Sequence, residues 1–153
     1  MLSIPFTVRR SIEIDKPPDS IFTSISDFNT WRSWSPWLSQ EPECPVEIGG
    51  VPGKPGHKQS WDGKKIGSGH MELSTVVPGQ TLEYDLSFVK PWKSQSKAAF
   101  EFEQEGQATR VTWSMEGTLP IFLFFMKKKM SAMVAKDYER GLAMLKKLLE
   151  AET

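Results

Sequence analysis

Few side chains of this 153-residue chain have the chemistry of a catalytic or metal-binding group. His57 and His70 are the only histidines, and no cysteine or carboxylate stands at tight metal-ligand spacing from them. No nucleophile–base pairing, glycine-rich phosphate loop or nucleotide-binding fingerprint can be identified. We therefore expect no bound metal and no cofactor.

The two histidines should lie on different sides of their strands. His70 has the opposite parity to Met71, so we expect it to be exposed rather than catalytic. His57 shares its parity with Gln59 and Trp61 and is a candidate to line a cavity.

Two charged residues occupy positions where an apolar side chain is expected. Asp137 falls on the apolar face of a C-terminal helix, and Arg10 has the inward parity of the first strand. A buried charge without a partner is costly. We predict that the two pair, either to fix the helix register or to anchor a polar group of a ligand. The alternative is that Asp137 lies in water at the edge of the apolar face while Arg10 extends to solvent.

Aromatic and sulfur-containing side chains are the candidate walls of a cavity. The chain has six Trp and nine Phe, which either fill a core or line a pocket. Ligand pockets are mainly apolar and hold a few polar groups. The candidate lining residues stand in the W-x-x-W-x-P-W motif, on inward strand parities or on the helix: Trp34, Trp37, His57, Trp61, Tyr84, Phe88, Phe100, Trp113, Met115, Met126, Met130, Met133, Val134 and Asp137.

The run from Phe122 to Leu149 is the element that must position many of these residues. Its apolar residues recur at helical spacing, and lysines take the other side. At about 1.5 Å per residue this helix would span roughly 40 Å, so it needs a wide apolar surface to lie on. Gly141, near the middle of the apolar face, costs about 1 kcal/mol relative to Ala and does not fit a plain core.

The preceding segments supply that surface as a sheet. A strand over residues 6–15 ends at Pro17-Pro18, which favours a helix start, and Asp27 or Asn29 suits the cap of a second short helix. Residues 36–56 are rich in Pro and Gly, so we expect loop there with one short edge strand. Further strands are expected over residues 57–61, 65–76, 81–88, 96–103 and 109–116, with a tight turn at Asp62-Gly63 and a strand end at Pro91.

Sequential hairpins make this sheet antiparallel, with one apolar face for the helix to cover. We predict a single α+β domain over residues 1–153: a curved antiparallel sheet of six to seven strands that wraps around a long C-terminal helix, with two short helices after the first strand. A strongly curved sheet around one helix tends to leave a space between them.

Composition excludes several classes of function. Nineteen basic and nineteen acidic residues leave no net charge, so nucleic-acid binding is not expected. A single cysteine, Cys44, allows no internal disulfide. Residues 1–10 do not have the pattern of a signal peptide, and no stretch is apolar enough to span a membrane. We expect a cytoplasmic protein.

An apolar hexamer from Ile121 to Met126 precedes Lys127, Lys128 and Lys129. Such a hexamer is not expected to be bare to water. It could close a cavity entrance or bury itself in a homodimer. Apolar residues beside a cationic cluster also suit docking on an anionic membrane, which is the third reading of the segment Ile121–Lys129.

Four stretches carry a resemblance to a known family: "RSIEIDKPPDSIFTSISDFNTWRSWSPW", "SWDGKKIGSGHMEL", "LEYDLSFVKPWKSQSKAAFEFE" and "TRVTWSMEG". Together they resemble the START-like (Bet v 1-like, SRPBCC) superfamily and, within it, the polyketide cyclase/dehydrase-like proteins. The resemblance covers nearly the whole chain and implies the helix-grip fold. It also implies a cavity between sheet and helix that holds lipids, sterols, polyketides or plant hormones, and it carries no catalytic motif.

We therefore expect the chain to bind a hydrophobic or amphipathic small molecule in that cavity. The alternatives are an enzyme of the cyclase/dehydratase type that uses the same cavity, and a protein-interaction module. An enclosed cavity with an isolated acid or histidine would favour the enzyme. An apolar cavity would favour the binder, and a filled interior the interaction module.

Overall fold

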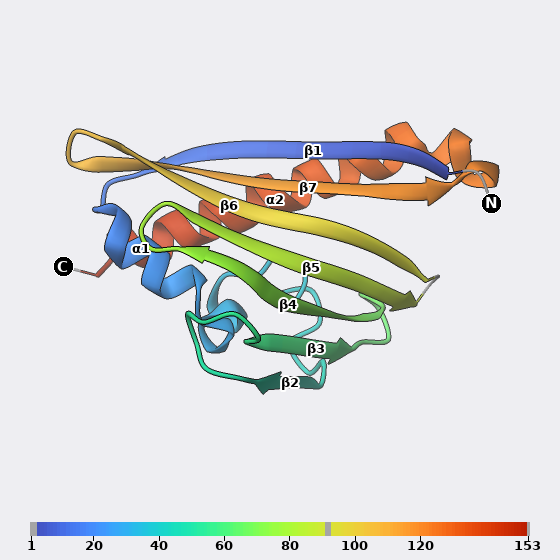
Figure 1. Ribbon diagram of the computed structural model, residues 1–153, viewed down its shortest axis with the longest axis horizontal. Helices are drawn as coiled ribbons and strands as arrows, with labels where there is room; N and C mark the ends of the chain where they lie inside the picture. Colours follow the sequence, from blue (N-terminus) through green and yellow to red (C-terminus); the bar gives the residue numbers. More distant parts are fainter. Residues whose placement is uncertain (1–2, 91–92, 153) are drawn as a thin grey trace.

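The computed structural model describes residues 3–90 and 93–152 of the chain (Figure 1). Pro91, at which we predicted a strand end, lies outside these residues. The elements follow in the order β1 (Ser3–Ile14), α1 (Pro18–Ile25), η1 (Phe28–Ser33), β2 (Val46–Gly49), β3 (Lys58–Asp62), β4 (Ser68–Val77), β5 (Thr81–Lys90), β6 (Ser94–Glu105), β7 (Ala108–Pro120), η2 (Ile121–Met126) and α2 (Lys127–Glu150).

The strands form one seven-stranded antiparallel sheet in the order β1-β7-β6-β5-β4-β3-β2. Five of these neighbours follow from successive hairpins, whereas β1 joins the sheet beside β7 and leaves its other edge free. The register places Phe100 of β6 opposite Trp113 of β7, and Ala98 opposite Met115. The alternating apolar residues therefore share one face, as the parity in the sequence predicts.

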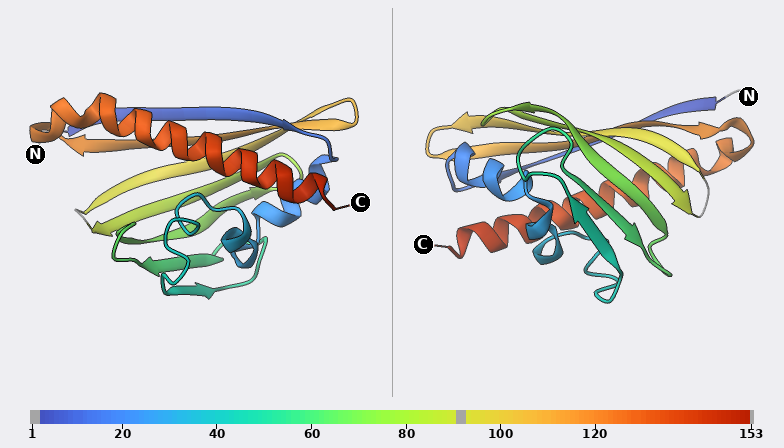
Figure 2. Two further views of the ribbon diagram at one scale, coloured as in Figure 1. Left: turned by 180° about the vertical axis from the view of Figure 1, so that it is seen from behind. Right: turned by 60° about the horizontal axis from the view of Figure 1, so that its bottom comes forward.

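Helix α2 crosses this apolar face, and α1 and η1 close one end of the sheet near the end of α2 (Figure 2). The predicted α+β helix-grip fold is thus confirmed. Two short helices follow β1, and the Asp27 side chain accepts a hydrogen bond from the Asn29 N–H at the start of η1, as a cap should. No helix of the described residues is both long enough and apolar enough to cross a membrane.

The two halves of α2 differ in how closely they approach the sheet. Leu142, Leu145 and Leu149 in the second half are buried, whereas Met133 in the first half is 56% exposed. Met130, Met133 and Val134 of the first half line a space that separates this part of the helix from the sheet. Gly141 is explained by the close approach in the second half, because a Cβ there would lie 2.9 Å from Pro36 Cδ and 3.0 Å from Trp113 Cζ3.

Two local predictions were wrong. The long helix begins at Lys127 rather than Phe122, because Ile121–Met126 form a separate 3-10 turn with a kink at Leu123. No tight turn lies at Asp62-Gly63. The chain instead loops from β3 to β4 around the carboxylate of Glu41, which accepts hydrogen bonds from three successive backbone N–H groups of residues 64–66.

Candidate functional site: an apolar pocket between the sheet and helix α2

A pocket of about 250 Å³ lies between the inner face of the sheet and the raised first half of α2. Its volume is close to the lower end of the range for small-molecule sites. Its walls come from β1, β3–β7, α2 and the segment after η1. The predicted lining residues that it contains are Trp37, Trp61, Phe88, Trp113, Met115, Met130, Met133, Val134 and Asp137.

Five predicted lining residues lie elsewhere. Trp34, Tyr84 and Phe100 are fully buried among other aromatic rings, and none of them lines the pocket. Met126 ends η2 outside the pocket, because the helix does not extend back to it. His57 is the fifth, and its position has a different cause.

His57 lies just before β3, in the core next to η1, with both ring nitrogens engaged. Its Nε2 accepts a hydrogen bond from the Phe28 N–H at 3.0 Å, and its Nδ1 lies 2.9 Å from the Gly49 carbonyl oxygen. A ring that accepts at Nε2 and donates at Nδ1 connects η1 to the last residue of β2. The histidine is therefore a structural link rather than a cavity residue. His70 is exposed, as predicted.

The aromatic core supports the pocket from beneath. Trp113 stacks on Tyr138 of α2 with ring centroids 3.8 Å apart and on Phe100 of β6 at 4.8 Å. Each aromatic pair contributes about 0.5–1.5 kcal/mol beyond its buried area. This stack fixes the pocket face of Trp113 relative to both the sheet and the helix. Tyr138 also lines the pocket, and burial raises the pKa of its phenol, so the hydroxyl stays protonated.

The predicted pair of Arg10 and Asp137 does not form. Arg10 lies on β1, the edge strand, so its side chain reaches past the sheet edge and binds Glu139 at 3.0 Å between Nε and Oε1. Asp137 faces the pocket and accepts from the Trp37 Nε1–H at 3.1 Å and from Arg140 at 2.9 Å. The negative charge of Asp137 is therefore stabilised by the indole N–H of Trp37 and by the guanidinium of Arg140, one turn along α2.

Two polar atoms of pocket-lining residues have no hydrogen-bond partner within the described part of the chain. They are Oε1 of Gln59 on β3 and Nε1 of Trp113 on β7. Gln59 is 5% exposed and Trp113 is fully buried. An unpaired buried polar atom costs about 1–3 kcal/mol, so such atoms call for an explanation. One is an acceptor and the other a donor, and a bound molecule with matching groups would satisfy them.

Sequence reasoning named neither Gln59 nor Tyr138 as a site residue. The signal for Gln59 was present, because it shares the inward parity of Trp61 on a short strand. A polar residue at an inward position is the informative exception to the apolar pattern. Helical spacing alone does not distinguish Tyr138 from a core residue, and only the packing of α2 shows that its ring borders the pocket.

The pocket opens beside the first half of α2. Met133 lines it and is 56% exposed, so this side chain is in contact with both pocket and solvent. Lys90 at the end of β5, Ser94 at the start of β6 and Thr118 near the end of β7 also line it. The opening therefore lies at the end of the sheet where β5 and β7 finish and η2 begins.

The opposite wall of the pocket includes Ile66, which belongs to the loop held by Glu41. The backbone N–H groups of Lys64 and Lys65 are the largest influences on this carboxylate and lower its pKa. Glu41 is therefore held ionised, and it ties the segment after η1 to the loop between β3 and β4.

Among the described residues, no group of three or more His, Cys, Asp or Glu side chains is arranged to hold a metal ion.

Solved structures with the same fold are numerous. Protein MLL2253 from Mesorhizobium loti has 16% identity and a TM-score of 0.74, covering 97% of this chain and 99% of that chain. TTHA0849 from Thermus thermophilus has 19% identity and a TM-score of 0.70, covering 97% and 100%. The Aha1 dimer from Colwellia psychrerythraea has 17% identity and a TM-score of 0.66, covering 92% and 93%.

At these identities the solved structures establish the fold alone. No curated protein matches the chain. The family described as "Polyketide cyclase / dehydrase and lipid transport" matches over residues 5–150, which is nearly the whole sequence and includes every wall of the pocket. The resemblance noted in the sequence is confirmed, and the chain belongs to this polyketide cyclase/dehydrase family of the SRPBCC type.

Proposed function

We propose that the protein binds a small, mainly apolar molecule with at least one hydrogen-bonding group in the pocket between the sheet and α2. The observation that carries the proposal is the combination of an apolar pocket with two unpaired polar atoms, Gln59 Oε1 and Trp113 Nε1. A filled core would have no such pocket beside these atoms. The family description, which names polyketide chemistry and lipid transport, is consistent with such a ligand.

The lining narrows the chemistry of the ligand. Aromatic and methionine side chains favour flat or flexible apolar groups, because rings stack and Met adapts its shape. Gln59 Oε1 requires a donor, and the Trp113 Nε1–H requires an acceptor. A hydroxyl group is the smallest group that supplies both. A phenol, an alcohol or a partly reduced polyketide therefore fits this lining better than a pure hydrocarbon.

Catalysis in the same pocket is the alternative function, because the family description includes cyclases and dehydrases. Asp137 is the only carboxylate among the described residues that line the pocket. Its two oxygens are already bound to Trp37 and Arg140. Neither oxygen can approach a substrate proton without giving up one of these contacts, which supports binding over general base catalysis.

Native mass spectrometry of the purified protein, followed by denaturing extraction, tests the proposal. We expect a co-purified apolar molecule, or binding of 2-naphthol when it is added to the stripped protein. Val134→Trp should fill the pocket and abolish both. The matched control is Ala132→Trp, which places the same side chain on the exposed side of α2. Equal binding by the two variants would contradict the proposal.

A further inference from the structure

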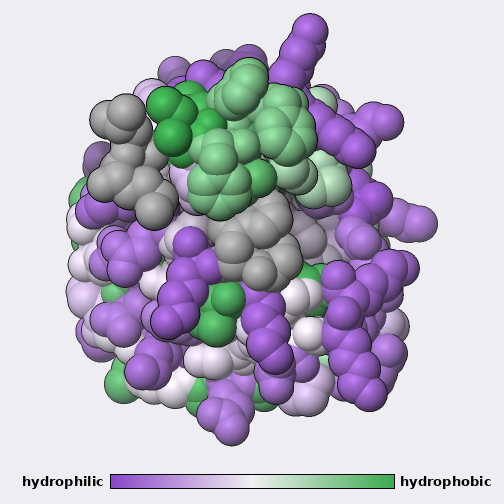
Figure 3. All heavy atoms as spheres, turned by 90° about the vertical axis from the view of Figure 1, so that its right-hand side faces the viewer, coloured by the Kyte–Doolittle hydropathy of each residue, from purple (hydrophilic) through white to green (hydrophobic). Residues whose placement is uncertain are grey.

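The turn η2 leaves an apolar surface in water. Ile121 is 45% exposed, Phe122 65%, Phe124 67% and Phe125 68%. We call these four residues the η2 patch. Figure 3 shows it as a green area at one end of the molecule, with hydrophilic side chains along part of its border. None of the four lines the pocket, so η2 does not close the pocket in this structure.

Lysines surround the η2 patch. Lys127, Lys128 and Lys129 follow it directly in the first turn of α2, and all three are exposed. Lys90 and Lys93 are exposed at the same end of the sheet, where β5 ends and β6 begins. No ion pair found among the described residues involves any of these five lysines. The patch therefore lies within a region of uncompensated positive charge.

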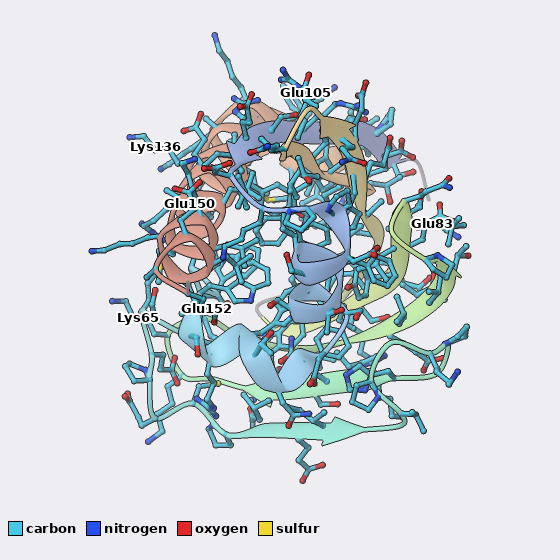
Figure 4. All side chains as sticks on the ribbon, turned by 90° about the vertical axis from the view of Figure 1, so that its left-hand side faces the viewer. Lys65, Glu83, Glu105, Lys136, Glu150 and Glu152 are labelled. Carbon is cyan, nitrogen blue, oxygen red and sulfur yellow. The ribbon has the colours of Figure 1, made fainter. Side chains whose placement is uncertain are left out.

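The opposite end of the molecule carries charged residues of both signs. Figure 4, viewed from that end, labels Glu83, Glu105, Glu150 and Glu152 together with Lys65 and Lys136, and Glu105 and Glu150 have basic partners. The net charge of the whole chain is zero, so the positive end is offset by negative charge elsewhere. A local cluster of positive charge turns that end of a protein toward an anionic surface without making the whole protein a general polyanion binder.

We infer that the η2 patch docks on an anionic lipid membrane. Aromatic and aliphatic side chains would enter the boundary between headgroups and acyl chains, while Lys127–Lys129 bind the headgroups. A second copy of this chain fits less well. A two-fold dimer would place each patch against itself and would bring the two lysine clusters together, where they repel.

Docking through the η2 patch would bring the pocket opening to the membrane. The pocket opens at the same end of the sheet, beside Met133, Thr118 and Lys90. A docked molecule would hold this opening at the membrane surface, where an apolar ligand is dissolved. Docking itself does not depend on which ligand the pocket takes, so it can be tested without one.

Co-sedimentation of the full chain with lipid vesicles tests the inference. The vesicles contain phosphatidylcholine alone or phosphatidylcholine with about one third phosphatidylserine. We expect binding to the anionic vesicles only, with loss of binding at high salt because the lysine contribution is screened. Each lysine near such a surface contributes about fivefold, so Lys127→Gln, Lys128→Gln and Lys129→Gln together should weaken binding on the order of 100-fold.

The apolar contribution needs its own variant. Phe124→Ser with Phe125→Ser should weaken binding at least about tenfold, because two inserted rings are lost. Both side chains are exposed, so the thermal unfolding midpoint should not change. The charge control replaces three exposed lysines away from the patch: Lys58→Gln, Lys136→Gln and Lys147→Gln. It should bind as the unmodified protein does.

Three results would overturn the inference. The first is no binding to anionic vesicles at low salt. The second is equal weakening by the lysine control, which would show that position does not matter. The third is a dimer in analytical ultracentrifugation that Phe124→Ser with Phe125→Ser dissociates. That result would assign the η2 patch to a contact between copies of the chain.

Discussion

Replacing Gln59 with Leu separates the stability of the empty protein from its affinity for a ligand. In the empty pocket Gln59 Oε1 is buried without a partner, and this costs about 1–3 kcal/mol. Leu has a similar size and no polar atom, so Gln59→Leu should raise the free energy of unfolding by about 1 kcal/mol. In the complex the same atom accepts a hydrogen bond, so the substitution should weaken binding of a ligand that donates one.

The magnitude can be measured with two probes that differ by one hydroxyl group, 2-naphthol and naphthalene. A hydrogen bond contributes about 0.5–1.5 kcal/mol, which corresponds to roughly a two- to tenfold preference for 2-naphthol beyond the difference in their solubilities. Isothermal titration of the unmodified protein should show this preference, and Gln59→Leu should remove it. Gln95→Leu, on the exposed side of β6, is the matched control and should change neither quantity.

Two results would refute the reasoning. If urea unfolding shows that Gln59→Leu destabilises the empty protein by more than about 1 kcal/mol, then Oε1 already has a stabilising partner. If the preference for 2-naphthol persists in the variant, then Gln59 does not face the ligand. Either result would leave the pocket but would remove its assigned polar contact.

Three further outcomes follow from packing and charge. Gly141→Ala should lower the free energy of unfolding by about 1–3 kcal/mol in urea titrations, because the added methyl would overlap Pro36 and Trp113; no change would mean that this contact relaxes freely. Backbone N–H donors lower the pKa of Glu41 from its ordinary value of 4.5, so its stabilising effect is complete above that value and is lost as the pH falls through the lowered pKa. Glu41→Gln should lower stability at pH 7 and reduce the loss of stability in acid, and the same acid limb in the variant would contradict this account. Arg10→Gln with Asp137→Asn should show no coupling in a double-mutant cycle, because the two side chains bind different partners.

The sheet and its register could be predicted because alternation specifies which residues share a face. Phe100 and Trp113 were assigned to one apolar face, and the structure pairs them directly. Whether such residues line the pocket depends on how other elements, α2 among them, pack against the sheet. The alternation of residues along a strand carries no information on that packing. Phe100 is core because the rings of Trp31, Trp34, Tyr84 and Trp113 pack around it, whereas Met115 lies two residues along β7 from Trp113 and borders the pocket.

The errors in charged and loop residues have a common cause. The observed conformation of each residue depends on a partner distant in the sequence or on the place of its strand in the sheet. Parity predicts that Arg10 points inward. Because β1 is an edge strand, the side chain instead extends past the edge of the sheet and pairs with Glu139. Asp62-Gly63 suggests a tight turn, but Glu41 supplies acceptors that stabilise a longer loop. His57 has the parity of a cavity residue, yet η1 and the last residue of β2 occupy both of its ring nitrogens.

The indole N–H signals in a two-dimensional nitrogen–proton spectrum test the binding site most directly. Trp113 and Trp34 both have a buried indole N–H without a partner among the described residues, but only Trp113 lines the pocket. Each signal can be assigned by its loss on substitution with Phe. On titration with 2-naphthol, we predict that the Trp113 signal shifts to low field while the Trp34 signal stays in place. A saturating titration that leaves the Trp113 signal unmoved, or shifts both signals equally, would contradict this assignment of the site.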